Sequence, residues 1–258
     1  MSLTPRARRR KPTLAFTLKL SEAFVLPHCS GSGFAPYMYD MKAILPLVLL
    51  FWSSALAAQG LPVLPVQDHA VWQAVGRVNA AGYRTREMCT GTLIAPDKVL
   101  TAAHCVAGTD GLGPLPHEFT FVAGWLRGTA ADSVPGRAVW IHPRAYSEGQ
   151  LDVRFDVAIL TLERVSKITP LPLVATETSA PYGILGYSTR RPHMLGASFG
   201  CDGQVTSALL RLDCPVTPGN SGGPVLARVG AHWEVAGVIS AMGQTGALAV
   251  PVSRVPRP

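Results

Sequence analysis

The segment Pro218–Val225 (PGNSGGPV) surrounds one serine, Ser221, with three glycines and leads straight into an apolar run. Glycine permits backbone angles and close approaches that other residues resist. Consecutive N–H groups near Gly219 and Ser221 can therefore point at one spot and bind a negatively charged oxygen. A plain turn would also use glycine, but the apolar run after this segment and the cysteine before it, Cys214, favour a built site.

Two other segments place a polar side chain at the end of an apolar run. Leu100–Cys105 (LTAAHC) puts His104 directly before a cysteine, and Phe155–Leu160 (FDVAIL) puts Asp156 at the start of a core strand. A histidine in fixed orientation suits a general base, and a carboxylate at the mouth of a core strand needs a donor such as an imidazole N–H. Taken singly, each could instead be an ordinary strand-end residue. Asp152 is a weaker candidate because it stands further from the apolar run.

In the order His, Asp, Ser, the three segments resemble the chymotrypsin-like (trypsin fold) serine proteases. Residues 219–224, Gly-Asn-Ser-Gly-Gly-Pro, are similar to the bacterial branch of that family. Trp233–Ser240 resembles the strand that follows the nucleophile and lines the substrate cleft. The resemblance extends over about residues 66–255, nearly all of the chain that follows the leader described below.

This resemblance implies a role for each matched residue. Ser221 would be the nucleophile, His104 the base and then the acid, and Asp156 the group that orients the imidazole and stabilises its charged form. The N–H groups of Gly219 and Ser221 would form the oxyanion hole. Ser240 would lie beside Asp156 and offer its backbone to the substrate.

Composition points to an all-β fold. The chain has 258 residues with 25 glycines and 22 prolines, and its 48% hydrophobic and 15% charged content excludes general disorder. Short apolar runs between turn residues are typical of antiparallel sandwiches and barrels. The resemblance implies two packed six-stranded antiparallel β-barrels, which we expect at residues 58–170 and 171–258. The expected strands are Val71–Val78, Thr92–Ala95, Val99–Ala102, Phe119–Val122, Ala138–Ile141, Val157–Leu162, Val205–Leu210, Pro224–Val229, Val235–Ser240 and Ala247–Val250.

The net charge of +7 does not indicate nucleic-acid binding once the charges are located. Residues 1–57 carry seven basic and two acidic groups, so the remaining chain has 16 basic and 14 acidic groups and a net charge of +2. A nearly neutral body lacks the basic surface that polyphosphates require. We therefore expect no nucleic-acid partner.

The beginning of the chain contains a secretory signal. Met41-Lys42 is followed by an apolar run and by Ala55-Leu56-Ala57, which predicts a signal peptide over residues 41–57. The run is shorter than the ~20 residues that span a bilayer. Residues 1–40 are interpreted as an upstream extension with a misassigned start, the alternative being a genuine arginine-rich region. We expect a secreted or periplasmic protein without stable membrane association after signal cleavage.

Cysteine usage agrees with export. Four cysteines follow the leader, Cys89, Cys105, Cys201 and Cys214, and an even number in an exported chain suggests two disulfides with three possible pairings. None of them forms a CxxC pair, so no metal site is expected. The separation of Cys89 from Cys105 matches the histidine-loop disulfide of the family that the chain resembles.

The pattern departs from the animal enzymes in two places. Asn220 stands where those enzymes have an aspartate that pairs with a new amino terminus, so we expect activity without zymogen cleavage. The substrate-binding residues implied by position are Val216, Ile239, Ser240 and Met242, whose mostly apolar character predicts cleavage after small or medium apolar residues.

These observations predict a serine endopeptidase acting on polypeptides, without cofactors and as a monomer. The alternative is a non-catalytic binding protein on the same fold. An α/β-hydrolase esterase is disfavoured because that fold needs the order Ser, Asp, His.

Overall fold

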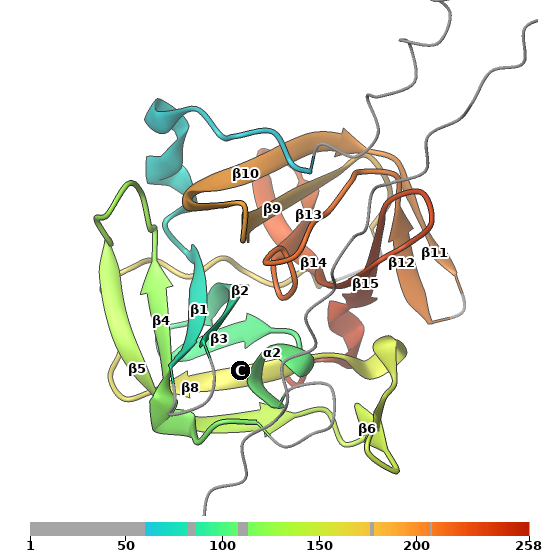
Figure 1. The fold of residues 1–258 in the computed structure, drawn as a ribbon. Helices are drawn as coiled ribbons and strands as arrows, with labels where there is room; N and C mark the ends of the chain where they lie inside the picture. The colour runs from blue at the N-terminus through green and yellow to red at the C-terminus, as the bar shows by residue number, and fades with distance from the viewer. Residues whose placement is uncertain (1–59, 82–85, 108–112, 176–177, 207, 258) are drawn as a thin grey trace, which may run out of the picture. The chain divides into compact units, whose positions relative to one another are not determined.

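The computed structural model describes residues 60–81, 86–107, 113–175, 178–206 and 208–257 (Figure 1). The predicted signal peptide at 41–57 and the predicted extension at 1–40 lie outside the described residues. No helix among the described residues is long and apolar enough to cross a membrane.

The first half of the described chain forms a closed antiparallel barrel. Its strand order is β1-β2-β3-β8-β5-β4. Alternate residues of one strand, Phe119 and Phe121, are fully buried in the barrel interior with Leu93 and Leu160, which is the two-residue period of a strand with one face inside. The strands are β1 (Val75–Ala81), β2 (Arg86–Ala95), β3 (Lys98–Thr101), β4 (Phe119–Ala123), β5 (Asp132–Ile141) and β8 (Ala158–Leu162).

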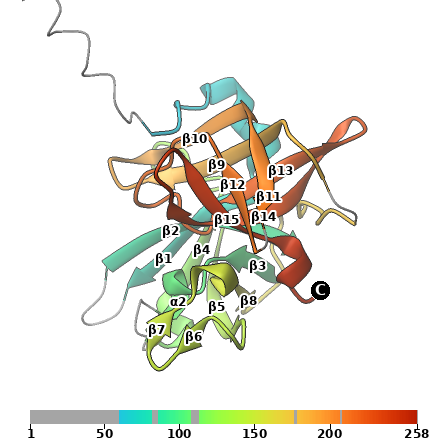
Figure 2. The same cartoon turned by 90° about the vertical axis from the view of Figure 1, so that its right-hand side faces the viewer.

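The second half forms one antiparallel sheet of seven strands in the order β10-β9-β13-β14-β15-β12-β11. Its two edge strands, β10 and β11, are separated in sequence only by Asp202, so one continuous run of chain forms both edges and the sheet curls round. In Figure 2 this sheet lies above the first barrel. The strands are β9 (Tyr182–Ser188), β10 (Arg191–Cys201), β11 (Gly203–Thr206), β12 (Leu209–Leu212), β13 (Pro224–Val229), β14 (His232–Met242) and β15 (Ala247–Pro251).

The expected all-β class and barrel architecture are confirmed, with local corrections. The second sheet has seven strands where six were expected, because the run from β10 to β11 is broken at one residue. The predicted strand Val205–Leu210 is wrong, because the chain turns back there and β11 pairs with β12. The prediction that a strand begins at Val71 is also wrong, because Val66–Trp72 is a 3-10 helix after Pro65.

Short elements complete the fold. They are the helix α2 (His104–Ala107), the hairpin β6 (Tyr146–Ser147) and β7 (Gln150–Leu151), and the 3-10 helices η1 (Val66–Trp72), η2 (Pro116–Glu118), η3 (Val153–Phe155) and η4 (Val252–Arg254).

A buried carboxylate ties β5 to the chain that follows β8. Asp132 accepts two hydrogen bonds from the Arg164 guanidinium, at 2.7 and 3.1 Å, one from the Ser166 hydroxyl and one from the Lys167 N–H. These bonds, led by those from Arg164, hold the pKa of Asp132 well below its usual range. The ion pair therefore stabilises the first barrel only while Asp132 is ionised.

Candidate active site

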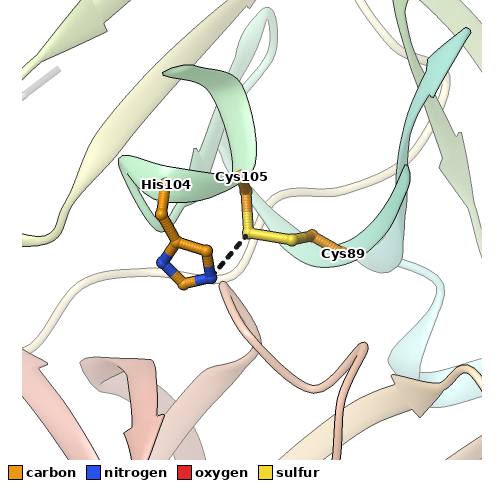
Figure 3. Close-up of side chains that lie close together, drawn as sticks. All are labelled: Cys89, His104 and Cys105. Atoms are coloured by element: carbon orange, nitrogen blue, oxygen red, sulfur yellow. Dashed lines mark hydrogen bonds between the residues drawn. A yellow bond between two sulfur atoms is a disulfide. The ribbon is translucent and has the colours of Figure 1, made fainter. Parts of the chain in front are cut away.

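A disulfide holds the helix that begins with His104. Cys89 of β2 and Cys105 of α2 are joined, and the ring nitrogen Nε2 of His104 lies 3.8 Å from the Cys105 sulfur (Figure 3). The second disulfide joins Cys201 to Cys214. Of the three pairings that the sequence allows, the structure therefore has the one between neighbours in sequence.

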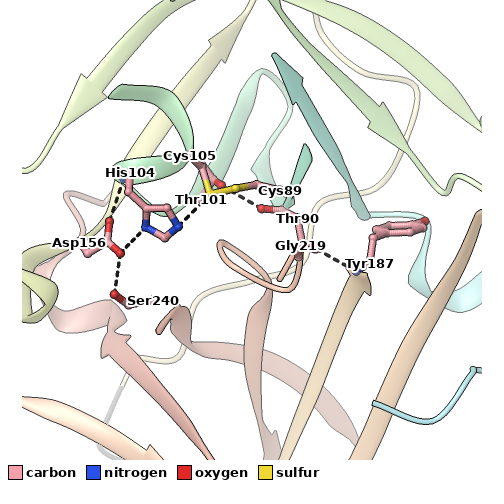
Figure 4. The surroundings of a disulfide bond; sticks show 9 residues. All are labelled: Cys89, Thr90, Thr101, His104, Cys105, Asp156, Tyr187, Gly219 and Ser240. Carbon is pink, nitrogen blue, oxygen red and sulfur yellow. Dashed lines mark hydrogen bonds and ion pairs between the residues drawn. A yellow bond between two sulfur atoms is a disulfide. The ribbon is translucent and has the colours of Figure 1, made fainter. Parts of the chain in front are cut away.

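Asp156 is fully buried and holds His104 at two points. One carboxylate oxygen, Oδ1, accepts the His104 backbone N–H at 2.9 Å, and Oδ2 lies 2.7 Å from Nδ1 of the same residue (Figure 4). An ionised carboxylate can only accept hydrogen bonds, so Nδ1 carries the ring proton and Nε2 is the acceptor nitrogen of the neutral imidazole. By contrast, Asp152 bonds to Arg154 beside it and does not take part in this arrangement.

Ser240 provides the third donor to Asp156. Its hydroxyl donates to Oδ2 at 2.5 Å across the boundary between the two halves of the fold. In the pairing of β14 with β15, Ile239 faces Ala249 and Ala241 faces Leu248, so Ser240 is the extra residue of a β-bulge. Bulges change the direction of a side chain, and this one allows Ser240 to reach Asp156.

Ser221 lies in the tight loop before β13, and this loop is pressed against the first barrel. The Ser221 carbonyl accepts the Thr90 N–H at 2.8 Å. Gly222 has a φ of +79°, and a Cβ at this position would lie 2.2 Å from both the Thr101 hydroxyl and the Thr90 carbonyl oxygen. Only glycine fits here, so the loop lies beside the end of β3, which leads directly to His104.

Asn220 is buried and its amide group is satisfied within the second sheet. Its Oδ1 accepts the Thr217 N–H at 2.7 Å, and its Nδ2 donates to the Tyr187 carbonyl at 2.8 Å. Gly219 before it has a φ of +96°. The loop conformation at this position therefore needs no buried charge.

The residues predicted to bind substrate differ in exposure. Val216 and Ile239 are buried, at 6% and 1% exposed, whereas Met242 is 61% exposed. The Ile239 N–H donates to Gly223 and its carbonyl accepts from Gly222, so this residue lies directly beneath the glycine turn. The assignment of these three side chains to a specificity pocket stays a prediction.

Two close groups of potential metal ligands occur in the described part of the chain. One combines Cys89, His104 and Cys105, and the other combines Cys201 and Cys214 with Asp213. In both groups the cysteines are joined as disulfides. A disulfide lacks the thiolate that binds a metal, so neither group suits a metal ion in this state.

Sequence reasoning missed Thr90 and Thr189, which hold the Ser221 loop. The Thr90 hydroxyl donates to the Gly219 carbonyl at 2.8 Å, and the Thr189 N–H donates to the Pro218 carbonyl at 2.9 Å. A threonine next to a cysteine in a strand is the only local signal for Thr90, and it is a weak one because threonine is common in strands.

Comparisons with known proteins place the chain in a family and show similar folds. A protein named Trypsin from Saccharopolyspora erythraea is 35% identical over 114 residues, which are 43% of this chain and 44% of that protein, so the match spans less than half of the relative. The protease Anisep from Arthrobacter nicotinovorans has a similar fold, with a TM-score of 0.59 and 17% identity over 69% of this chain and 90% of its own. The thermostable serine protease AL20 from an extremophilic microorganism has the same TM-score, with 18% identity over 70% of this chain and 92% of its own. The family model described as a trypsin-like peptidase domain matches residues 89–238, more than half of the chain, and the chain therefore belongs to the family of trypsin-like peptidases.

Proposed function

We propose that the chain is a secreted serine endopeptidase that hydrolyses peptide bonds through Ser221, His104 and Asp156. The observation that carries the proposal is the buried Asp156 carboxylate, which bonds to both the backbone and the ring of His104 and to Ser240. Three donors offset the cost of burying this charge, and they fix the tautomer in which Nε2 can accept a proton.

In the proposed reaction, Ser221 attacks the carbonyl carbon of the scissile bond while Nε2 of His104 accepts the hydroxyl proton. The C–N bond then breaks as that proton passes to the leaving amine, and an acyl-enzyme remains. Water repeats the sequence on the acyl ester and restores Ser221. The N–H groups of Gly219 and Ser221 stabilise the oxyanion, at about 3 kcal/mol for each donor.

We propose that this peptidase needs no zymogen cleavage. The support is Asn220, whose amide is fully bonded to Thr217 and Tyr187 inside the second sheet. Because these bonds already hold Asn220, the loop conformation does not require an ion pair with a new amino terminus. A secreted chain that becomes active only after proteolysis near Val66 would contradict this part of the proposal.

The substrate is proposed to be a polypeptide cleaved after a small or medium apolar residue. The support is the apolar nature of Val216, Ile239 and Met242. All groups in the reaction are side chains or backbone amides of the chain itself, and the proposal includes no metal or organic cofactor. A peptide-library digest tests the preference, and strong cleavage after arginine, lysine or glutamate would overturn it.

We propose that the predicted signal peptide at 41–57 directs secretion and that residues 1–40 are an untranslated extension. The mature enzyme is proposed to be a monomer. Two disulfides in the described residues agree with an oxidising compartment. Amino-terminal sequencing and the intact mass of the exported protein test the export and the start site, and its mass in solution tests the monomer. A mature chain that still carries Arg8-Arg9-Arg10 would contradict the proposed start at Met41.

A fluorophosphonate probe tests the catalytic proposal directly. We expect one probe per molecule, attached at Ser221, with no reaction in Ser221→Ala and full reaction in Ser253→Ala, an exposed serine of η4. Hydrolysis of a protein substrate should disappear in the first variant alone. If the folded wild type neither reacts nor hydrolyses, the alternative of a non-catalytic binding protein would replace the proposal.

A further inference from the structure

Thr90 is a buried residue of the first barrel that bonds to the Ser221 loop of the second sheet. Its N–H donates to the Ser221 carbonyl, and its hydroxyl donates to the Gly219 carbonyl, each at 2.8 Å. The same hydroxyl accepts the Tyr187 N–H at 2.9 Å (Figure 4). The Thr90 carbonyl in turn accepts the Thr101 hydroxyl at 2.8 Å. All the hydrogen-bonding groups of Thr90 are therefore engaged, most of them across the boundary between the two halves.

We propose that Thr90 is a positioning residue for the oxyanion hole, an inference that rests on the proposed function. The two carbonyls that it holds, those of Gly219 and Ser221, belong to the residues whose N–H groups are the proposed donors, and each lies in the peptide plane that directly follows its donor. The loop is thereby held in place from the barrel that also carries His104.

The other two carbonyls of the loop are held as well. The Pro218 carbonyl accepts the Thr189 N–H at 2.9 Å, and the Asn220 carbonyl accepts the Gly223 N–H at 2.9 Å. Four consecutive carbonyls are thus bonded, and Thr90 supplies the donors for two of them. The Thr90 hydroxyl restrains the carbonyl side of one of the four peptide planes, and the Thr90 N–H restrains another.

The bonded carbonyls determine where the open N–H groups point. In a trans peptide the N–H and the C=O point in opposite directions, so bonding the Pro218 carbonyl turns the Gly219 N–H the other way. Bonding the Asn220 carbonyl does the same for the Ser221 N–H. Among the described residues, neither of these two N–H groups has a partner within the molecule, which is the arrangement an oxyanion requires.

The chain contains a matched control for the hydroxyl of Thr90. Thr92 lies two residues further along β2 and is also buried, at 1% exposed, but its hydroxyl has no partner in the described part of the molecule. Thr90→Val and Thr92→Val make the same chemical change at the same depth in one strand. Only the first removes a bond to the loop, the one to the Gly219 carbonyl, because the backbone N–H that bonds to Ser221 is kept.

The test measures three quantities: kcat per active site, with the sites counted by fluorophosphonate titration; KM; and the affinity for a peptide aldehyde. The aldehyde forms a tetrahedral adduct with the nucleophile. Thr90→Val should lower kcat at least tenfold, because a single oxyanion donor is worth about 10²–10³ in kcat. Its KM should stay within about twofold, because the oxyanion hole stabilises the charged oxyanion far more than the neutral carbonyl of the bound substrate. Aldehyde affinity should fall with kcat, Thr90→Ser should restore both, and Thr92→Val should match the wild type.

The outcomes separate this inference from the proposed function. If the wild type does not react with the fluorophosphonate, the proposed function fails and the inference falls with it. If the wild type reacts and Thr90→Val keeps its kcat per titrated site, the inference alone is overturned. A kcat loss of equal size in Thr92→Val, or in both Thr90→Val and Thr90→Ser, would also overturn it. If Thr90→Val does not fold, Thr90→Ala removes the hydroxyl without adding a methyl group and is read in the same way.

Discussion

Asn220→Asp offers a quantitative test of how the loop is held. The substitution keeps the shape of the side chain but replaces Nδ2, which now donates to the Tyr187 carbonyl at 2.8 Å, with an oxygen. An ionised aspartate would place a negative charge against that carbonyl at a site 1% exposed, with no cation among the described contacts of Asn220. An unpaired buried charge costs about 3–5 kcal/mol.

The penalty should depend on pH in a defined way. In the unfolded chain this aspartate has a pKa of about 3.9, whereas burial and the facing carbonyl raise its pKa in the folded state. Below about pH 4 both states are protonated, and the protonated acid can still donate to Tyr187, so the variant should be nearly as stable as the wild type. As the pH rises, the variant should lose about 1.4 kcal/mol per pH unit, and a total of about 4 kcal/mol corresponds to a pKa raised by about three units.

The assay is urea denaturation of Asn220→Asp between about pH 4 and 8, in a Ser221→Ala background that prevents self-digestion. The chain's other asparagine, Asn79, is the control because its Oδ1 already accepts a bond from Arg77 at 3.2 Å. Asn79→Asp should change the free energy of unfolding by less than about 1 kcal/mol. A loss in Asn220→Asp that is independent of pH, or a gain in stability at neutral pH, would refute the reasoning.

Three other perturbations have expected results. Asp132→Ala should lower the free energy of unfolding by about 3 kcal/mol at neutral pH. This difference from the wild type should shrink as the pH falls from about 4 towards the lowered pKa of Asp132 in the folded protein, because the ion pair stabilises only the ionised form. Urea denaturation at several pH values measures the difference, and a difference that does not change with pH would contradict the prediction. Replacing Cys201 and Cys214 with alanine opens a loop with a sequence separation of 13. This change should lower the free energy of unfolding by about 3 kcal/mol and the Tm measured by calorimetry by about 6–12 °C. An unchanged Tm would show that this disulfide does not stabilise the fold. Gly222→Ala should abolish fluorophosphonate labelling, because its Cβ would meet backbone and side-chain oxygens at 2.2 Å, and a fully labelled variant would mean that the loop can move away.

The parts of the site that could be predicted from sequence are those whose requirements are local. Ser221 stands among glycines that its own loop needs, and His104 stands beside a cysteine that ties down the same turn. Asp156 lies at the end of η3, two residues before the core strand β8. In each case the residue types that the chemistry needs lie within one short segment, which is why the segment can be recognised, whereas partners that hold it, such as Thr90 for the Ser221 loop and Ser240 for Asp156, lie far away in sequence.

Strand β9 was not predicted because a distant contact shapes its sequence. Glycine normally weakens a strand, and Gly183 and Gly186 interrupt the apolar pattern of Tyr182–Ser188. A Cβ at Gly186 would lie 2.8 Å from the Asn220 side-chain nitrogen. The glycine is needed because the Ser221 loop crosses β9 at close range, and this crossing is visible only in three dimensions.

The importance of Thr90 was missed for a similar reason. Its partner Gly219 is 129 residues away, and a buried threonine in a strand satisfies β propensity whether or not its hydroxyl is used. Thr92 has the same residue type, strand and burial without any bond from its hydroxyl. Sequence alone cannot distinguish the two.

The two halves of the fold are joined by two kinds of interaction with different consequences. One apolar cluster includes Leu100 and Ile159 of the first barrel together with Tyr182 and Leu185 of the second sheet. Apolar burial is strong but non-directional, so it holds the halves together without fixing their position to a fraction of an ångström. Hydrogen bonds are directional. Three of those made by Thr90, and the one from Ser240 to Asp156, cross the boundary within the candidate site itself. Removing an apolar side chain from the shared cluster should therefore mainly lower stability, whereas removing one of these polar groups should mainly lower kcat in the molecules that remain folded.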